Sequence, residues 1–115
     1  MSKITIYHNP RCSKSRQTLA LLQENGVEPD VVLYLETPPS QAELAGLLKK
    51  LGIAAIELVR TKEDAFKAAG LSRESDDAAL VAAMVEYPKL IERPIVVKGQ
   101  QAVLGRPPEN VLSLL

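Results

Sequence analysis

The pattern of apolar and polar residues in the first third of the chain predicts a strand, a helix and a second strand. Residues 4–7 are β-branched or aromatic, as is typical of a strand. Leu19 and Leu22 then recur at helical spacing, and Asn25-Gly26 is a natural end for that helix. The apolar run at residues 30–35 predicts a second strand, buried on both faces. Because a crossover of this kind is right-handed, we expect the two strands to be parallel.

The middle of the chain predicts helices alone. Ser40 and Glu43 form a capping-box signature, which opens a helix through about Leu51. Further helices are expected at residues 53–60, 63–69 and 76–87. The charged side chains of this part, Glu63 among them, are interpreted as a solvent-exposed face. We therefore expect an all-helical insert at about residues 40–88.

The last part of the chain predicts a hairpin and a closing helix. Strands are expected at residues 94–98 and 102–105, joined by a turn at Gly99-Gln100. A helix at residues 109–115 follows two prolines, which suit a first helical turn. This order of elements predicts a single α/β domain, residues 1–115, with a thioredoxin-like (glutaredoxin-like) fold and a mixed four-stranded sheet.

Composition limits the partners and the chemistry of any site. Fourteen Lys and Arg residues balance 14 Asp and Glu residues, so no overall field favours nucleic acid or an anionic membrane. The single cysteine excludes an internal disulfide, and with the single histidine it provides too few ligands for a typical structural zinc. We expect no metal. With no secretory leader and no apolar run of about 18 residues, we expect a cytoplasmic, soluble monomer.

The only cysteine, Cys12, falls between the first predicted strand and the helix. The first turn of a helix presents unpaired N–H groups and the positive end of the dipole, which stabilise a thiolate. A lone cysteine is more often a small buried side chain. Here the residues from Asn9 to Arg16 are turn-forming or polar, which favours a reactive thiol. Two interpretations of His8 stay open: it supports the thiolate, or it is a strand-end histidine hydrogen-bonded to the backbone.

Three arginines are candidates for binding an anion near this thiol. Arg60 ends a predicted helix, whereas Arg93 and Arg106 each precede a proline at the same end of the hairpin. Arg93 and Arg106 can therefore converge. They also approach Cys12 if the third strand runs antiparallel to the first. Guanidinium groups bind tetrahedral oxyanions through paired hydrogen bonds, although a single arginine is more often a solvent-exposed charge.

These residues lie in motifs that together resemble the ArsC family of glutathione- and glutaredoxin-coupled arsenate reductases. The motifs are HNPRCSKSR after the first strand, then YLETPP, ERPIVV and GRPPE. The similarity extends over essentially the whole chain. In its length and its sequence motifs the chain resembles a short branch of the family, usually called YfgD. It is less like the arsenate reductases that continue beyond the last helix.

The resemblance implies a role for each candidate residue. Cys12 would be the nucleophile, and His8 would help to lower its pKa. Asn9 and Ser15 belong to the same loop and would help to bind the substrate. The arginines that would bind the oxyanion and the arsenylated intermediate are Arg60, Arg93 and Arg106. The resemblance also implies a cis peptide bond before Pro94.

The activity that the resemblance implies is reduction of arsenate to arsenite through an adduct on Cys12. No cofactor would be bound; glutathione would be a co-substrate and glutaredoxin a partner. An alternative is a glutathione-dependent thiol oxidoreductase with another substrate. A further alternative is an interaction protein resembling the Spx regulators, which contact RNA polymerase. That alternative is disfavoured because Asn9 and Ser15 stand where a C-x-x-C pair would need its second cysteine.

Overall fold

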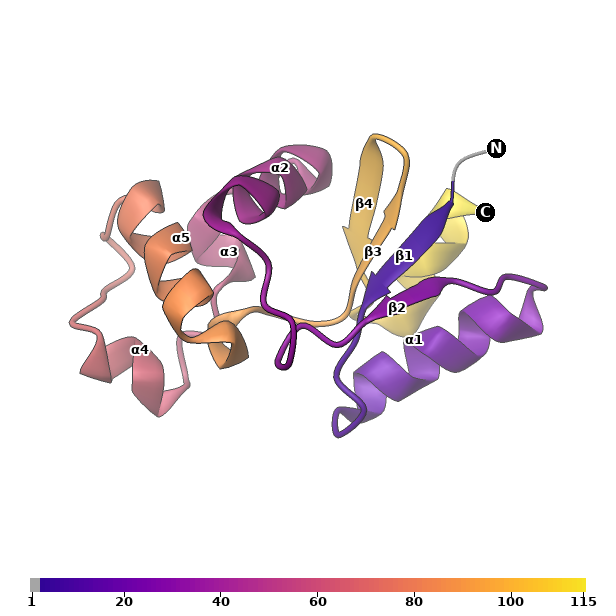
Figure 1. Cartoon of the computed structure of the whole chain (residues 1–115), viewed down its shortest axis with the longest axis horizontal. Coiled ribbons are helices and arrows are strands. Elements are labelled where there is room, and N and C mark those ends of the chain that lie inside the picture. Colours follow the sequence, from indigo (N-terminus) through magenta and orange to yellow (C-terminus); the bar gives the residue numbers. More distant parts are fainter. Residues whose placement is uncertain (1–2) are drawn as a thin grey trace. The chain divides into compact units, whose positions relative to one another are not determined.

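The computed structural model describes residues 3–115, which form two compact units. The first unit holds the described residues up to Thr37 together with Arg93–Leu115, and the second is Pro38–Glu92. All the strands labelled in Figure 1 belong to the first unit, whereas α2 to α5 belong to the second. Among residues 3–115, no helix combines the length and apolar character needed to span a membrane.

The first unit is a mixed sheet with two helical segments. Its elements are β1 (Ile4–Tyr7), α1 (Ser13–Glu24), β2 (Asp30–Val32), β3 (Ile95–Lys98), β4 (Gln101–Leu104) and the 3₁₀ helix η2 (Pro108–Leu114). The strand order is β2-β1-β3-β4. β1 pairs with β2 in parallel and with β3 antiparallel, and β4 completes an antiparallel hairpin. This topology confirms the predicted thioredoxin-like fold with a mixed four-stranded sheet.

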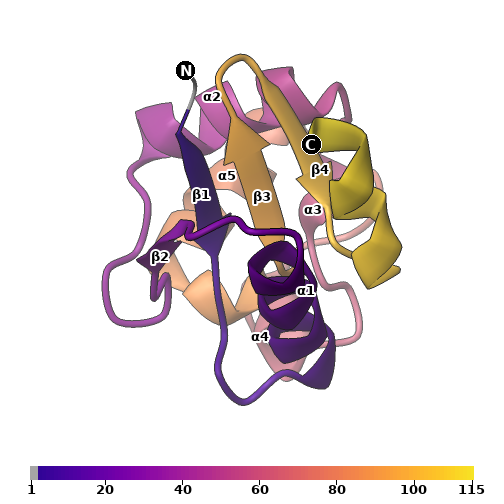
Figure 2. The same cartoon turned by 90° about the vertical axis from the view of Figure 1, so that its right-hand side faces the viewer.

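Apolar side chains on one face of the sheet pack against α1 and η2, which Figure 2 shows on the same side of the strands. Ile6 of β1 lies opposite Val96 of β3, and both are fully buried. Leu22 of α1 and Val111 of η2 complete this core and are also fully buried. Burial of each such side chain stabilises the fold by about 1.5–3 kcal/mol. The core thereby holds α1 against the sheet, with Cys12 at the carboxyl end of β1.

The second strand is shorter and more exposed than the sequence predicts. β2 ends at Val32 and lies at the edge of the sheet, where its residues are exposed or half-buried. The chain then turns, because the N–H groups of Glu36 and Thr37 both donate to the Leu33 carbonyl, at 2.9 and 2.8 Å. An apolar run therefore does not show here how far a strand extends. Leu33 and Leu35 leave the sheet instead and line the surface beside the end of β1.

The closing segment also differs from the prediction. The sequence predicts an α-helix at residues 109–115, but η2 is a 3₁₀ helix. The Asn110 N–H donates to the Pro107 carbonyl at 3.0 Å, and the Leu115 N–H donates to Leu112 at 3.2 Å. Short helical segments often adopt this tighter i→i+3 pattern.

The second unit is helical, as predicted. It contains α2 (Gln41–Leu51), α3 (Ala55–Leu58), α4 (Asp64–Ala68), α5 (Asp77–Glu86) and the 3₁₀ helix η1 (Pro88–Leu90). The capping box is confirmed, since Ser40 Oγ accepts from the Glu43 N–H at 3.1 Å and Glu43 accepts from Ser40 at 3.3 Å. α3 and α4 are shorter than predicted. Leu44, Leu80 and Met84 are fully buried and anchor the packing of α2 and α5.

Candidate active site

The segment from His8 to Cys12, called the Cys12 loop below, connects β1 to α1. The Cys12 N–H donates to the Asn9 carbonyl at 3.0 Å, which closes a tight turn. Cys12 is the N-cap of α1: its backbone is extended, and its carbonyl accepts the Arg16 N–H at 3.0 Å. The thiol is free and partly exposed. The structure therefore confirms that the cysteine stands at a helix N-terminus, beside N–H groups that have no helical partner.

Ser15 fixes the shape of the Cys12 loop from inside. Its hydroxyl is fully buried, lies 2.6 Å from His8 Nδ1 and accepts the Asn9 N–H at 3.0 Å. The Asn9 side chain in turn accepts the Arg11 N–H at 3.0 Å. These bonds engage Ser15 Oγ and Asn9 Oδ1 within the protein. The geometry thus gives both residues a positioning role, and their predicted contact with substrate stays a prediction.

The His8 imidazole is buried, and its Nδ1 is hydrogen-bonded to the Ser15 side chain, while the His8 backbone N–H donates to the Val32 carbonyl at 2.8 Å. Burial lowers the pKa of His8 below its usual value of 6.5, and the positive charge of Arg16 lowers it further. The imidazole is therefore neutral at neutral pH. It supplies no positive charge to Cys12 under these conditions, and any support it gives the thiolate acts through the hydrogen bond to Ser15.

We expect His8 to make the free energy of unfolding fall as the pH drops below about 6.5. The unfolded chain protonates its histidine near that pH, whereas the folded chain resists protonation until its lower pKa is reached. The stabilisation from the neutral imidazole is thus complete above about pH 6.5 and is lost toward lower pH. Urea denaturation at about pH 7.5 and about pH 5.5 measures the loss.

The variant His8→Asn is the matched control for this titration. Asparagine keeps a polar atom near the position of Nδ1 for Ser15 but does not ionise. Because His8 is the only histidine, the difference in pH dependence between the two proteins isolates its contribution. The same pH dependence in both proteins would contradict a lowered pKa for His8.

Arg93 and Arg106 converge, as predicted. The Gly105 N–H donates to the Pro94 carbonyl at 2.9 Å, and Arg106 Nη1 donates to the Arg93 carbonyl at 3.3 Å. Because β3 is antiparallel to β1 and Ile95 pairs with Tyr7, these two residues lie at the end of the sheet where the Cys12 loop begins. The peptide bonds before Pro94 and before Pro107 are both cis; the first was implied by the resemblance, and the second was not predicted.

Gly105 joins the end of β4 to α1, a contact that the sequence did not reveal. The buried Thr18 hydroxyl donates to the Lys14 carbonyl at 2.8 Å and approaches the Gly105 carbonyl at 3.3 Å. A Cβ atom at position 105 would lie 2.6 Å from Thr18 Oγ1 and 2.8 Å from Pro94 Cγ. Only glycine fits this contact, which fixes the residue before Arg106 against the cysteine-bearing helix.

Arg60 lies in the second unit, where carboxylates surround it. Its N–H donates to the Leu90 carbonyl at 2.7 Å. Its guanidinium contacts Glu63 at 2.8 Å and Glu92 at 3.7 Å. Glu63 is therefore an ion-pair partner and not just one of the solvated charges of a polar face. The predicted oxyanion contact of Arg60 stays a prediction.

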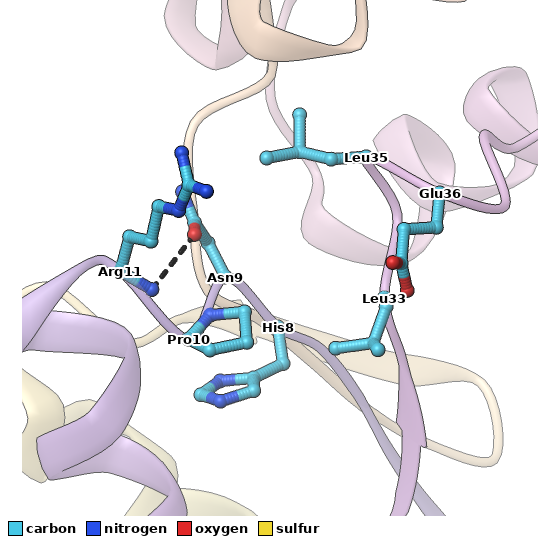
Figure 3. Close-up of a pocket in the computed structure, with 7 residues that line it drawn as sticks. All are labelled: His8, Asn9, Pro10, Arg11, Leu33, Leu35 and Glu36. Carbon is cyan, nitrogen blue, oxygen red and sulfur yellow. Dashed lines mark hydrogen bonds between the residues drawn. The ribbon is translucent and has the colours of Figure 1, made fainter.

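A cavity of about 350 Å³ opens beside the Cys12 loop, and we call it the loop cavity. Its lining residues come from the Cys12 loop and from the turn after β2: His8, Asn9, Pro10, Arg11, Leu33, Leu35 and Glu36. Figure 3 shows the two groups facing each other across the opening. The sequence did not predict this cavity, because it depends on the chain leaving the sheet after Val32.

The charges near the thiol suit an anion rather than a metal ion. The first turn of α1 carries no acidic residue, while Arg11, Lys14 and Arg16 flank the cysteine. Residues 3–115 contain no cluster of three or more His, Cys, Asp or Glu side chains that could hold a metal. A free thiol at a helix N-terminus, among cationic groups, can attack an electrophilic centre that carries negative charge.

Known proteins are similar to this chain in both sequence and fold. The model of the ArsC family matches residues 7–114. The uncharacterized protein YfgD of Escherichia coli (strain K12) is 59% identical over 115 residues, which cover 98% of this chain and 97% of that protein. An arsenate reductase of Neisseria meningitidis (serogroup B, strain MC58) is 46% identical over 117 residues and is covered over its full length. The solved structure of an arsenate reductase from Vibrio cholerae superposes with a TM-score of 0.95 at 52% identity, covering 99% of this chain and 98% of that one.

The family match extends over nearly the whole chain and includes the Cys12 loop, Arg93 and Arg106. The two sequence relatives are 59% and 46% identical over nearly their full length, and the solved structure has the same fold over nearly its full length. The chain therefore belongs to the ArsC family.

Proposed function

We propose that this protein is an arsenate reductase that uses Cys12 as its nucleophile. The observation that carries the proposal is the meeting of a partly exposed thiol at the N-terminus of α1 with the loops of Arg93 and Arg106 at the same end of the sheet. Relatives named arsenate reductase in Neisseria meningitidis and Vibrio cholerae support the choice of substrate.

In the first step the Cys12 thiolate attacks the arsenic atom. A sulfur–arsenic bond forms and one arsenic–oxygen bond breaks, and the departing oxygen leaves as water after taking up a proton. Arsenic stays pentavalent. The charge of the oxyanion opposes the approach of a thiolate, so Arg93 and Arg106 serve to neutralise it. Arg60 is proposed to contribute a third guanidinium group.

The reducing electrons must come from thiols outside the chain, because Cys12 is the only cysteine. We propose that glutathione adds to arsenic and a second oxygen leaves as water. The thiolate of glutaredoxin then attacks the glutathione sulfur, and the two sulfurs form a mixed disulfide. The electron pair of the broken arsenic–sulfur bond stays on arsenic, which becomes trivalent. Water finally displaces arsenite from Cys12.

The polar residues around the Cys12 loop prepare the thiol for this reaction. Ser15 and Asn9 hold the loop in one shape, and His8 orients Ser15 as a neutral partner. No resident cofactor is required by these steps. A free reactive thiol suits the reducing conditions of the cytoplasm, which is where we place the protein.

The proposal is tested by measuring arsenite formation from arsenate with glutathione and glutaredoxin supplied. A parallel reaction offers a glutathionylated peptide in place of arsenate. Arsenite formation well above the rate without the protein supports the proposed function. Reduction of the peptide with no arsenite formed would replace it with a glutathione-dependent thiol oxidoreductase of another substrate.

A further inference from the structure

The loop cavity has the size and lining of a site for a small molecule. Its volume of about 350 Å³ falls within the range of about 300–1,000 Å³ that small-molecule sites occupy. Pro10, Leu33 and Leu35 supply apolar surface, as most such sites require. Figure 3 shows the Arg11 guanidinium on the side of the Cys12 loop and the Glu36 carboxylate on the side of the turn after β2.

The two charged groups at the cavity favour a ligand that carries both charges. Within the described part of the chain, neither Arg11 nor Glu36 forms an ion pair, unlike Arg60, which contacts two carboxylates. A carboxylate on a ligand would form an ionic contact with Arg11, and an ammonium group would form one with Glu36. A small oxyanion alone would meet repulsion from Glu36, so this cavity is not a second arsenate site.

The loop cavity is also within reach of the sulfur. The turn closed by the Cys12 N–H and the Asn9 carbonyl holds the two Cα atoms within about 7 Å of each other. A tripeptide spans about 10 Å when extended. A ligand of that size, seated against Asn9 and Arg11, can therefore place a side chain beside Cys12.

The order of strands separates this cavity from the arginines. β1 leads into the Cys12 loop and has β2 on one side and β3 on the other. The loop cavity lies on the β2 side, because Leu33 and Leu35 follow that strand. Arg93 precedes β3 and lies on the opposite side. An oxyanion and a second ligand can thus reach the sulfur from different sides.

We propose that the loop cavity binds the thiol co-substrate, a small peptide thiol with a free carboxylate and a free ammonium group. This inference rests on the proposed function, because a second thiol is needed only if Cys12 forms an adduct. Arg11 and Glu36 hold the charged ends, and the leucines contact the apolar part of the peptide. The thiol then faces the arsenic atom across from the arginines, ready for the addition step described above.

Binding is tested with S-methylglutathione, whose blocked sulfur cannot react with Cys12. The full chain carries ¹³C-labelled leucine methyl groups for NMR titration. We expect saturable shifts at Leu33 and Leu35, with half-saturation at about 1 mM, as for other weak small-molecule sites. Shifts that fail to saturate by about 20 mM, or that appear at other leucines and not at these two, would overturn the assignment.

Two variants with matched controls locate the site. Glu36→Gln and Leu35→Ala should each weaken binding roughly three- to fivefold, as expected for loss of an exposed charge or apolar contact. Glu24→Gln, exposed near the end of α1, should leave binding unchanged. Leu112→Ala should do the same, and Leu112 is 44% exposed, like Leu35. Unchanged affinity in both cavity variants would overturn the proposal. Methyl shifts caused by a protein thiol such as reduced glutaredoxin, but not by S-methylglutathione, would also overturn it.

Kinetics separate this inference from the proposed function. In Glu36→Gln the KM for glutathione should rise by the same three- to fivefold, about the cost of one exposed ionic contact, while the KM for arsenate stays constant. A rise in the KM for arsenate instead would contradict separate sites for the two substrates. If the unaltered protein formed no arsenite at all, the proposed function would fail, whereas the titration would still decide what the loop cavity binds.

Discussion

Cys12→Ser should reduce arsenite formation by at least about 1,000-fold, the scale on which loss of a catalytic nucleophile acts. A serine hydroxyl is far less acidic than a thiol, so little of it ionises, and an oxygen–arsenic adduct only exchanges one oxygen for another. The chain holds no second cysteine that could take over. Arsenite released over time, with glutathione and glutaredoxin in excess, measures the loss.

Thermal unfolding of Cys12→Ser shows whether the variant is folded. Position 12 is the N-cap of α1, and the cysteine side chain makes no capping hydrogen bond there. Serine is among the best N-cap residues, so thermal unfolding of the variant should occur at the same temperature or a higher one. A folded but inactive variant assigns the loss to the sulfur. Turnover retained in Cys12→Ser would exclude the adduct mechanism.

The parts of the fold that could be predicted are those set by local chemistry. The capping box of Ser40 and Glu43, the Gly99-Gln100 turn and the β-branched and aromatic residues at 4–7 each determine a structure within a few residues. The position of Cys12 followed from the same kind of signal, a turn-forming segment before a helical repeat. These signals also give the order of elements, from which the sheet topology follows.

The loop cavity could not be predicted, because it depends on long-range packing. Val32 and Leu33 look alike in sequence, yet only the first pairs with β1, and the turn that follows places Leu35 beside the Cys12 loop. Likewise, nothing near Gly105 in sequence reveals that Thr18, which is 87 positions away, fills the space of its missing side chain.

The electrostatic state of individual residues depended on the same long-range information. The sequence left open how His8 acts on Cys12, whereas in the fold burial keeps its imidazole neutral. Arg60 was recognised as a candidate, while its partner Glu92 lies 32 positions away and could not be matched to it. Residue types therefore indicated the chemistry proposed for the site. The protonation state of His8 and the ion-pair partners of Arg60 could be determined only from the fold.

Arg106→Gln should lower kcat/KM for arsenate by about 10- to 100-fold, the effect of losing one or two hydrogen bonds to a charged group. Arg106 approaches Arg93 from β4 and lies at the end of the sheet that carries Cys12. Its guanidinium is exposed, and its bond to the Arg93 carbonyl is long, at 3.3 Å. Because this is an exposed surface side chain, the free energy of unfolding should change by less than about 1 kcal/mol.

Lysine at position 106 keeps the charge but not the paired geometry, so Arg106→Lys should recover only part of the activity. Arg73→Gln, in a turn of the second unit, is the matched control for loss of one exposed guanidinium and should keep the full kcat/KM. The KM for glutathione should stay constant in all three variants, because the loop cavity lies on the other side of β1. An unchanged kcat/KM for arsenate in Arg106→Gln would show that the oxyanion is not held by this arginine. The hydrogen bond from Arg106 to the Arg93 carbonyl would then have only a structural role, at the end of β4.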